Sequence, residues 1–237
     1  MPAQCTATHT RTMPTSAAAE LRLWQLISPT LPVGAYAYSA GLETAVDRGW
    51  VHDEHSFADW SAGQLAHALS NLDVPVLARM MAAWAAADQA EVAGWSRWLL
   101  ANRETSELRA EDRHLGRALA RLLADLGEPR ARDWRDHGDV SWATLFALAA
   151  VGWGISPAAA ARGYLWAWLE NQVAAAVKLV PLGQSAGQRT LLALADRIEP
   201  AVSSGLRLAD EDIGAATPGL ALASSWHETQ YTRLFRS

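Results

Sequence analysis

Residues 156–181 read SPAAAARGYLWAWLENQVAAAVKLVP and predict the longest apolar helix in the chain. Ser156 can cap this helix, and Pro157 suits its first turn because the backbone N–H that proline lacks would have no partner there. Pro181 ends the helix, because a proline interrupts the hydrogen bonds of the next turn. Apolar side chains recur at helical spacing on one face, at Leu165, Leu169, Val173 and Val177.

Helical signals dominate the other segments as well, and the alternation typical of strands is nearly absent. We expect further helices at about 20–27, 39–49, 55–69, 73–87, 92–101, 103–126, 141–150, 184–203 and 211–231. Asp73 is the expected N-cap of one of them, with Pro75 in its first turn. The predicted fold class is all-α: a single compact bundle of about ten helices with a flexible N-terminal leader and C-terminal tail.

The expected domain limits follow from the same pattern. We expect a disordered leader over residues 1–18, one helical domain over 19–226 and a partner-binding tail over 227–237. No internal repeat or low-complexity boundary divides the helical part. A folded domain of this size buries about 70–75% of its unfolded surface, so a large core is available.

Composition argues against a nucleic-acid binder. The 237 residues carry a formal net charge of −5, and Lys178 is the only lysine. The arginines are interleaved with acidic residues, whereas a nucleic-acid binder presents a clustered basic face. Half of the residues are apolar and 12 are tryptophan, which suits either a dense core or an adhesive interface.

Targeting signals are weak. Cys5 is the only cysteine, so no disulfide framework forms within the chain and a reducing compartment is favoured. The first sixteen residues lack the apolar run of a secretory signal. Residues 140–161 carry no formal charge, but serine, glycine and proline interrupt them, so we expect two buried helix ends and a turn there rather than a membrane span. We therefore expect a cytoplasmic protein that does not insert into membranes.

Catalytic patterns are missing from the sequence. His52 and His55 can share a helical face, but a transition-metal site normally takes three or four ligands, and a polar loop before a helix explains both residues. The alternative is a metal-dependent helical enzyme that uses these two histidines and a third brought close by folding. Lys178 has no glycine-rich run before it, which excludes a phosphate loop of the Walker kind. We expect no catalytic residue, no metal site and no cofactor.

The end of the chain is unusually rich in residues that proteins bury or dock. It includes Tyr231, Arg233, Leu234, Phe235 and Arg236. Terminal residues fray unless they are tied down, and tyrosine and arginine are enriched at interface centres. Two alternatives follow: the tail docks on a partner, or a last turn folds back on its own core.

Four polar side chains interrupt the apolar 156–181 helix, namely Glu170, Asn171, Gln172 and Lys178. Burying such groups unpaired costs about 1–3 kcal/mol each, so they need partners. In one interpretation, they form a hydrogen-bonded network in the core or lie at a helix edge that faces solvent. In the other, they hold the tail and the loop before residue 43 against this helix and so make a docking surface. For Tyr36 and Tyr38, a core position and an interface position are equally compatible with the sequence.

Four ordered segments carry a resemblance to a known family. Residues 28–43 read SPTLPVGAYAYSAGLE, residues 168–173 read WLENQV, and residues 178–184 read KLVPLGQ, followed by GQR at 187–189. Together with the tail, they resemble the urease accessory protein F (UreF) family over nearly the whole chain.

The resemblance implies an all-helical, cytosolic, non-catalytic homodimer. Such proteins bind UreD (also called UreH) and the GTPase UreG, bridge that GTPase to apo-urease for GTP-dependent nickel insertion, and modulate GTP hydrolysis. The resemblance assigns a partner-binding role to Tyr36 or Tyr38, which it does not separate, and to Arg233. The full expected partner-binding set is Tyr36, Tyr38, Glu170, Gln172, Lys178, Gln184, His227, Glu228, Gln230, Tyr231, Arg233, Leu234, Phe235 and Arg236.

Overall fold

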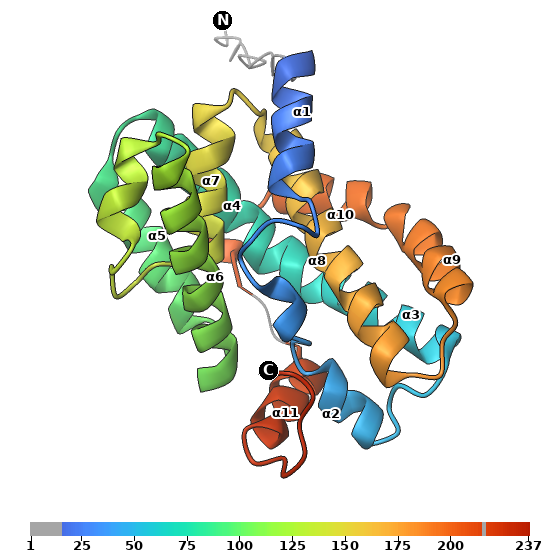
Figure 1. The fold of residues 1–237 in the computed structure, drawn as a ribbon. Helices are drawn as coiled ribbons and strands as arrows, with labels where there is room; N and C mark the ends of the chain where they lie inside the picture. The colour runs from blue at the N-terminus through green and yellow to red at the C-terminus, as the bar shows by residue number, and fades with distance from the viewer. Residues whose placement is uncertain (1–15, 215–216) are drawn as a thin grey trace, which may run out of the picture.

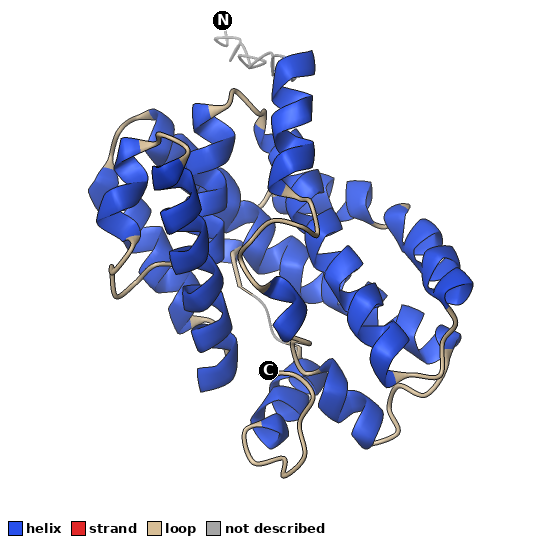
Figure 2. Ribbon diagram, in the orientation of Figure 1, coloured by secondary structure: helices blue, strands red, loops and turns tan. Residues whose placement is uncertain are grey.

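The structure is a computed structural model that describes residues 16–214 and 217–237. Its α-helices are α1 (Ala17–Leu26), α2 (Leu42–Asp47), α3 (Glu54–Gln64), α4 (Val74–Ala85), α5 (Gln89–Ala101), α6 (Ser106–Asp125), α7 (Trp142–Gly152), α8 (Pro157–Leu179), α9 (Gln184–Ala195), α10 (Ile198–Gly205) and α11 (Pro218–His227). The other helical elements are the 3-10 helices η1 (Ala35–Ala37), η3 (Pro129–Trp134) and η4 (Asp210–Asp212) and the π-helix η2 (Leu65–Asp73). No strand occurs in the described residues (Figure 2), so the predicted all-α class is confirmed.

The predicted leader falls mostly on residues 1–15, which lie outside the described residues. From Ser16 onward the chain can be followed, and the Ser16 hydroxyl accepts the Ala19 N–H to cap α1. Residues 17 and 18, which we assigned to the leader, already belong to this helix.

Helix α8 is the central element of the bundle (Figure 1). It begins as expected, with the Ser156 side chain capping the Ala159 N–H and Pro157 in the first turn. Leu165 and Leu169 are fully buried, and the helix packs against α2, α4, α7, α9 and α10. The longest apolar stretch of the sequence therefore forms the axis on which the other helices are placed.

Helix α7 lies in the core and contacts α4 and α6. Every residue from Ala143 to Ala150 is buried. The uncharged stretch 140–161 consists of this helix, a turn with Gly154 at positive φ, and the start of α8, which is the arrangement predicted. None of the helices in the described ranges is long and apolar enough to cross a bilayer.

Two predicted helices are shorter or divided in the structure. The helix expected over 184–203 breaks between α9 and α10, because Pro200 lacks a backbone donor and is accommodated only in the first turn of a new helix. The helix expected from residue 211 begins only at Pro218, for the same reason.

The prediction that Asp73 caps a helix is wrong. Helices α3 and α4 are joined through the π-helical η2, so the backbone stays helical from Glu54 to Ala85, and Asp73 has helical dihedral angles with no capping bond. Its carboxylate instead faces the interior and is 1% exposed. The cap preference of aspartate is a local effect, and here a distant buried cation overrides it.

That cation is Arg103, which lies between two buried carboxylates. Its guanidinium donates to both oxygens of Asp73 at 2.6 and 3.1 Å, and its Nε donates to Asp112 at 2.8 Å. Asp112 also accepts the Trp142 N–H at 2.7 Å, and the Tyr164 hydroxyl donates to Asp73 at 3.1 Å. Since these residues belong to different elements, the cluster joins η2, α6, α7 and α8 at one point.

Replacing Arg103 with methionine should destabilise the fold by about 3–5 kcal/mol, because two buried carboxylates lose their common cation. The matched control is Arg162→Met, which removes the exposed bridge to Glu199 and should cost about 1 kcal/mol or less. Urea unfolding followed by circular dichroism measures both values. Equal stability losses in the two variants would contradict the assignment of the cluster.

Candidate protein-interaction site

The last residues of the chain fold back onto the segment between α1 and α2. The Arg236 N–H donates to the Ala37 carbonyl at 2.9 Å, and the Ser39 N–H donates to a C-terminal oxygen of Ser237 at 3.0 Å. Phe235 and Ser237 are buried, and the C-terminus lies close to α11 and α2 in Figure 1. The tail is therefore packed on its own core rather than loose, which is the second of the two alternatives that the sequence left open.

Glu43 is the side chain that holds the tail in this position. It lies in the first turn of α2 and is 7% exposed. Its Oε1 accepts the Leu234 N–H at 2.6 Å, and its Oε2 accepts the Phe235 N–H at 2.9 Å. Hydrogen bonds to an ionised acceptor are about twice as strong as neutral ones, so one buried carboxylate fixes two consecutive backbone amides.

His227 extends this contact from α2 to α6. The ring is fully buried, with Nε2 3.2 Å from Glu43 Oε2 and Nδ1 2.6 Å from Glu107 Oε2. Glu107 in turn accepts a hydrogen bond from Arg233 at 2.6 Å. A ring nitrogen that carries a proton donates to the carboxylate it faces. The result is a continuous row of alternating acidic and basic groups that joins the tail to two helices.

The first residues after α11 also contact the start of α6. Glu228 accepts hydrogen bonds from the Ser106 N–H at 2.9 Å and from the Ser106 hydroxyl at 2.6 Å. The hydroxyl bond is the main cause that lowers the pKa of Glu228, and the helix N-terminus favours a negative charge there. Gln230 accepts from the Thr44 hydroxyl at 2.9 Å, so both residues hold the tail as well as lying near the surface.

Three of the four polar residues of α8 contact the loop or the tail, which is one of the alternatives that the sequence left open. Asn171 donates to the Tyr38 carbonyl at 3.1 Å, and Gln172 donates to the Ser39 carbonyl at 3.2 Å. The Lys178 ammonium lies 5.5 Å from the centre of the Phe235 ring, within the range of a cation–π contact.

Two other residues of the expected set have no such contact. The pKa of Glu170 is raised by burial, and no hydrogen bond of its carboxylate with the tail occurs in the described residues. Gln184 is exposed at the start of α9 and is not brought together with the tail.

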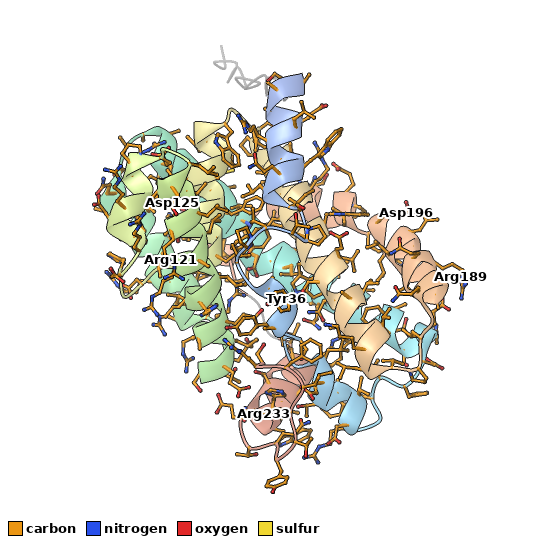
Figure 3. The ribbon with its side chains drawn as sticks, viewed as in Figure 1. Tyr36, Arg121, Asp125, Arg189, Asp196 and Arg233 are labelled. Carbon is orange, nitrogen blue, oxygen red and sulfur yellow. The ribbon has the colours of Figure 1, made fainter. Side chains whose placement is uncertain are left out.

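The two tyrosines that the sequence could not separate have different environments. Tyr36 is 70% exposed, whereas Tyr38 is 6% exposed, with its ring 5.9 Å from that of His114. Burial raises the pKa of Tyr38. Tyr36 is therefore the one that can meet a partner, and it lies near the middle of the face shown in Figure 3, with Arg233 at the lower end.

The packed tail leaves selected side chains outside. Tyr231 is fully exposed and Leu234 is 65% exposed. Arg233 is exposed beside them while it contacts Glu107. Buried hydrogen bonds thus present apolar and cationic groups at fixed positions, which is the chemistry of a binding surface.

The extreme end of the chain contacts a residue that lines a cavity. The Ser237 hydroxyl donates to Glu111 at 2.6 Å, and Glu111 lines a cavity of about 140 Å³ together with Asp112, Trp142 and Tyr164. Burial raises the pKa of Glu111 to about 7, with the neighbouring Asp112 adding to the rise and the Ser237 bond opposing it.

The histidines of the alternative hypothesis lie elsewhere, before and within α3. Asp53 caps α3 in a reciprocal arrangement with Ser56, and His52 and His55 are largely exposed beside Asp53 and Asp59. Within 16–214 and 217–237, no group of three or more histidine, cysteine or acidic residues could hold a metal ion. The arrangement is that of a polar loop before a helix.

Three residues that organise this region were not identified from the sequence, namely Glu43, Glu107 and Glu111. Glu43 and Glu107 lie in the first turn of a helix, where acidic residues are common for electrostatic reasons alone, and Glu111 lies one turn further along α6. Their partners lie more than a hundred positions away in the chain. The quoted 28–43 segment includes Glu43, but no local pattern marks it as the anchor.

Glu43→Gln should release the tail, because one carboxylate oxygen becomes an amide that cannot accept a backbone N–H. Trypsin should then cut after Arg233 and Arg236 about tenfold faster or more, and the loss of a buried acceptor should cost about 1–3 kcal/mol. Mass spectrometry of timed digests measures the rate. The control Glu54→Gln changes an exposed glutamate bound to Arg189. Digestion of Glu43→Gln at the control's rate would show that the tail is held by other contacts.

Glu111 should make stability depend on pH. Because its folded pKa lies above its ordinary value, the folded protein keeps a proton that the unfolded chain releases, so this group lowers stability as pH rises from about 4.5 to about 7. The free energy of unfolding of Glu111→Gln, relative to that of the native protein, should therefore rise by roughly 2–3 kcal/mol between about pH 5 and about pH 8. Urea unfolding at both pH values tests this. A constant difference between the two proteins would contradict a raised pKa.

Comparison with known proteins gives the family. The family model described as UreF matches residues 51–195. A urease accessory protein UreF from Alkalilimnicola ehrlichii is 60% identical over 219 residues, which are 92% of this chain and 96% of the relative. The UreF of Hahella chejuensis is 48% identical over 217 residues, 92% of this chain and 97% of the relative. The UreF of Pseudoalteromonas translucida is 45% identical over 236 residues, 97% of this chain and 100% of the relative. The chain belongs to the UreF family of urease accessory proteins.

Proposed function

We propose that this protein is a non-catalytic interaction protein of urease maturation. It bridges apo-urease and UreD to the GTPase UreG, supports GTP-dependent nickel insertion and modulates the GTPase. The relatives are named as urease accessory proteins. The observation that carries the proposal is the packed tail, which presents Tyr231, Arg233 and Leu234 beside the exposed Tyr36.

Preorganisation is the physical basis of this role. A disordered tail would lose conformational entropy on binding, which costs about 2–5 kcal/mol of the interaction energy. A tail already fixed by Glu43 and His227 loses less, so more of the contact energy appears as affinity. The partner then binds a preformed surface, in which buried groups fix the geometry and exposed groups make the contact.

Further parts of the proposal come from the family resemblance. We place the protein in the cytoplasm as a homodimer, and Leu21 and Trp24 on α1 are exposed apolar side chains that a second copy would cover. The described residues give no specific support to the metal-dependent enzyme, because His52 and His55 lie apart from the packed tail and its cavity.

A double substitution, Tyr231→Ala with Leu234→Ala, should weaken co-purification with UreD at least about tenfold and leave stability unchanged, because both side chains are exposed and paired exposed anchors are hot-spot candidates. The matched control is Leu192→Ala, an equally exposed apolar residue on α9. Normal recovery of UreD by the double variant would remove these residues from the interface.

Arg233→Ala and Tyr36→Ala test recruitment of the GTPase. Each should reduce UreG capture by the protein–UreD complex and lower the nickel content of reconstituted urease, whereas Arg189→Ala on α9 should not. Circular dichroism checks the fold of each variant. If both variants load nickel as the native protein does, this face is not the GTPase site.

A further inference from the structure

Helix α6 carries four arginines at intervals of four residues, namely Arg109, Arg113, Arg117 and Arg121. Residues four apart are neighbours on a helix surface, and like charges at that spacing destabilise the helix. Figure 3 labels one of the four, Arg121, on α6. A row of unfavourable neighbours needs a compensating interaction.

The first two arginines have internal partners. Arg109 donates to the Arg103 carbonyl at 2.6 Å, and Arg113 donates to the Gly138 carbonyl at 3.0 Å. For Arg117 and Arg121, no ion pair or hydrogen bond with another side chain occurs within the described residues. Asp125, one turn beyond Arg121, is bound by Arg135. Arg117 and Arg121 therefore carry positive charge that no acidic side chain within the described residues pairs with.

The end of the tail adds a third cation to this half of the row. Arg236 is exposed, and its backbone N–H donates to the carbonyl of Ala37, which precedes the Tyr38 whose ring lies against His114 on α6. Partial burial lowers the pKa of His114, and the charges of Arg236, Arg121 and Arg117 lower it further. The charges of Arg117, Arg121 and Arg236 thus all affect the same side chain, His114. We call these three arginines and His114 the arginine patch.

We propose that the arginine patch binds an acidic segment of a partner protein. Guanidinium groups match carboxylates with paired hydrogen bonds, and the patch adjoins the loop that carries the exposed Tyr36, since Gly34 of that loop lies beside His114. An aromatic side chain next to cations suits a polypeptide with mixed acidic and apolar residues. This inference goes beyond the proposed function and does not depend on it, because the patch is complete in the isolated chain.

A nucleic acid fits the patch less well. Binding to a phosphate backbone draws on many cations along a track, and here three arginines stand in a chain of net charge −5. A long polyanion would also meet the acidic remainder of the surface. A short acidic segment contacts the local charge alone, because salt screens the rest beyond about 10 Å.

The test is binding of a fluorescein-labelled peptide of about ten glutamates to the full chain, measured by anisotropy. We expect saturable binding that weakens as salt rises. Arg117→Glu with Arg121→Glu should weaken it at least about tenfold, and the milder Arg117→Gln with Arg121→Gln should weaken it less while keeping the side-chain stems. The matched control, Arg197→Glu with Arg207→Glu, makes the same change in net charge at two exposed arginines and should bind as the native chain does.

Three results would overturn the proposal. Equal losses in the α6 variant and the control would mean that only net charge matters. Tighter binding of a thymidine oligonucleotide of equal charge would assign the patch to nucleic acid. Displacement of the peptide by inorganic phosphate at equal charge concentration would show that the patch binds small anions without preference for an acidic polypeptide.

Discussion

The hydrogen bonding of the buried Glu43 carboxylate is the interaction on which the shape of the proposed binding face depends. It accepts two backbone amides of the tail and lies against His227, so the end of the chain, α2 and α11 share one anchor. A buried charge is costly unless it is paired and hydrogen-bonded. These partners all come from the tail and the end of α11. The Glu43 carboxylate therefore has its hydrogen-bond partners while the tail is packed and loses them when the tail is removed.

The anchor is supported by the core beneath it. Arg103 joins Asp73 at the end of η2 to Asp112 on α6, and the Tyr164 hydroxyl links α8 to Asp73. Helix α6 in turn supplies Glu107 and Glu111 to the tail. The packing of the bundle thus sets the position of the tail. A partner that contacts the tail is therefore also positioned relative to α6. Such a fixed arrangement suits the proposed role of bringing other proteins of urease maturation together.

Local rules predicted the helices, and long-range contacts decided the site. Ser156 and Pro157 start α8 as the sequence indicates, because capping and proline effects act over a few residues. Asp73 was misassigned because its partner, Arg103, lies thirty positions away. Tyr36 and Tyr38 have the same residue type in the same loop, and only the position of the tail and of α6 determines which one is exposed.

The central claim is that the tail is fixed before any partner arrives. Hydrogen exchange at the Leu234 and Phe235 amides of the isolated protein tests it most directly, because both amides are bound to Glu43. These two amides should exchange at least about a hundredfold more slowly than in an unfolded peptide of the same sequence. Exchange at the rate of the unfolded peptide would contradict it and would make the tail a segment that orders only on binding.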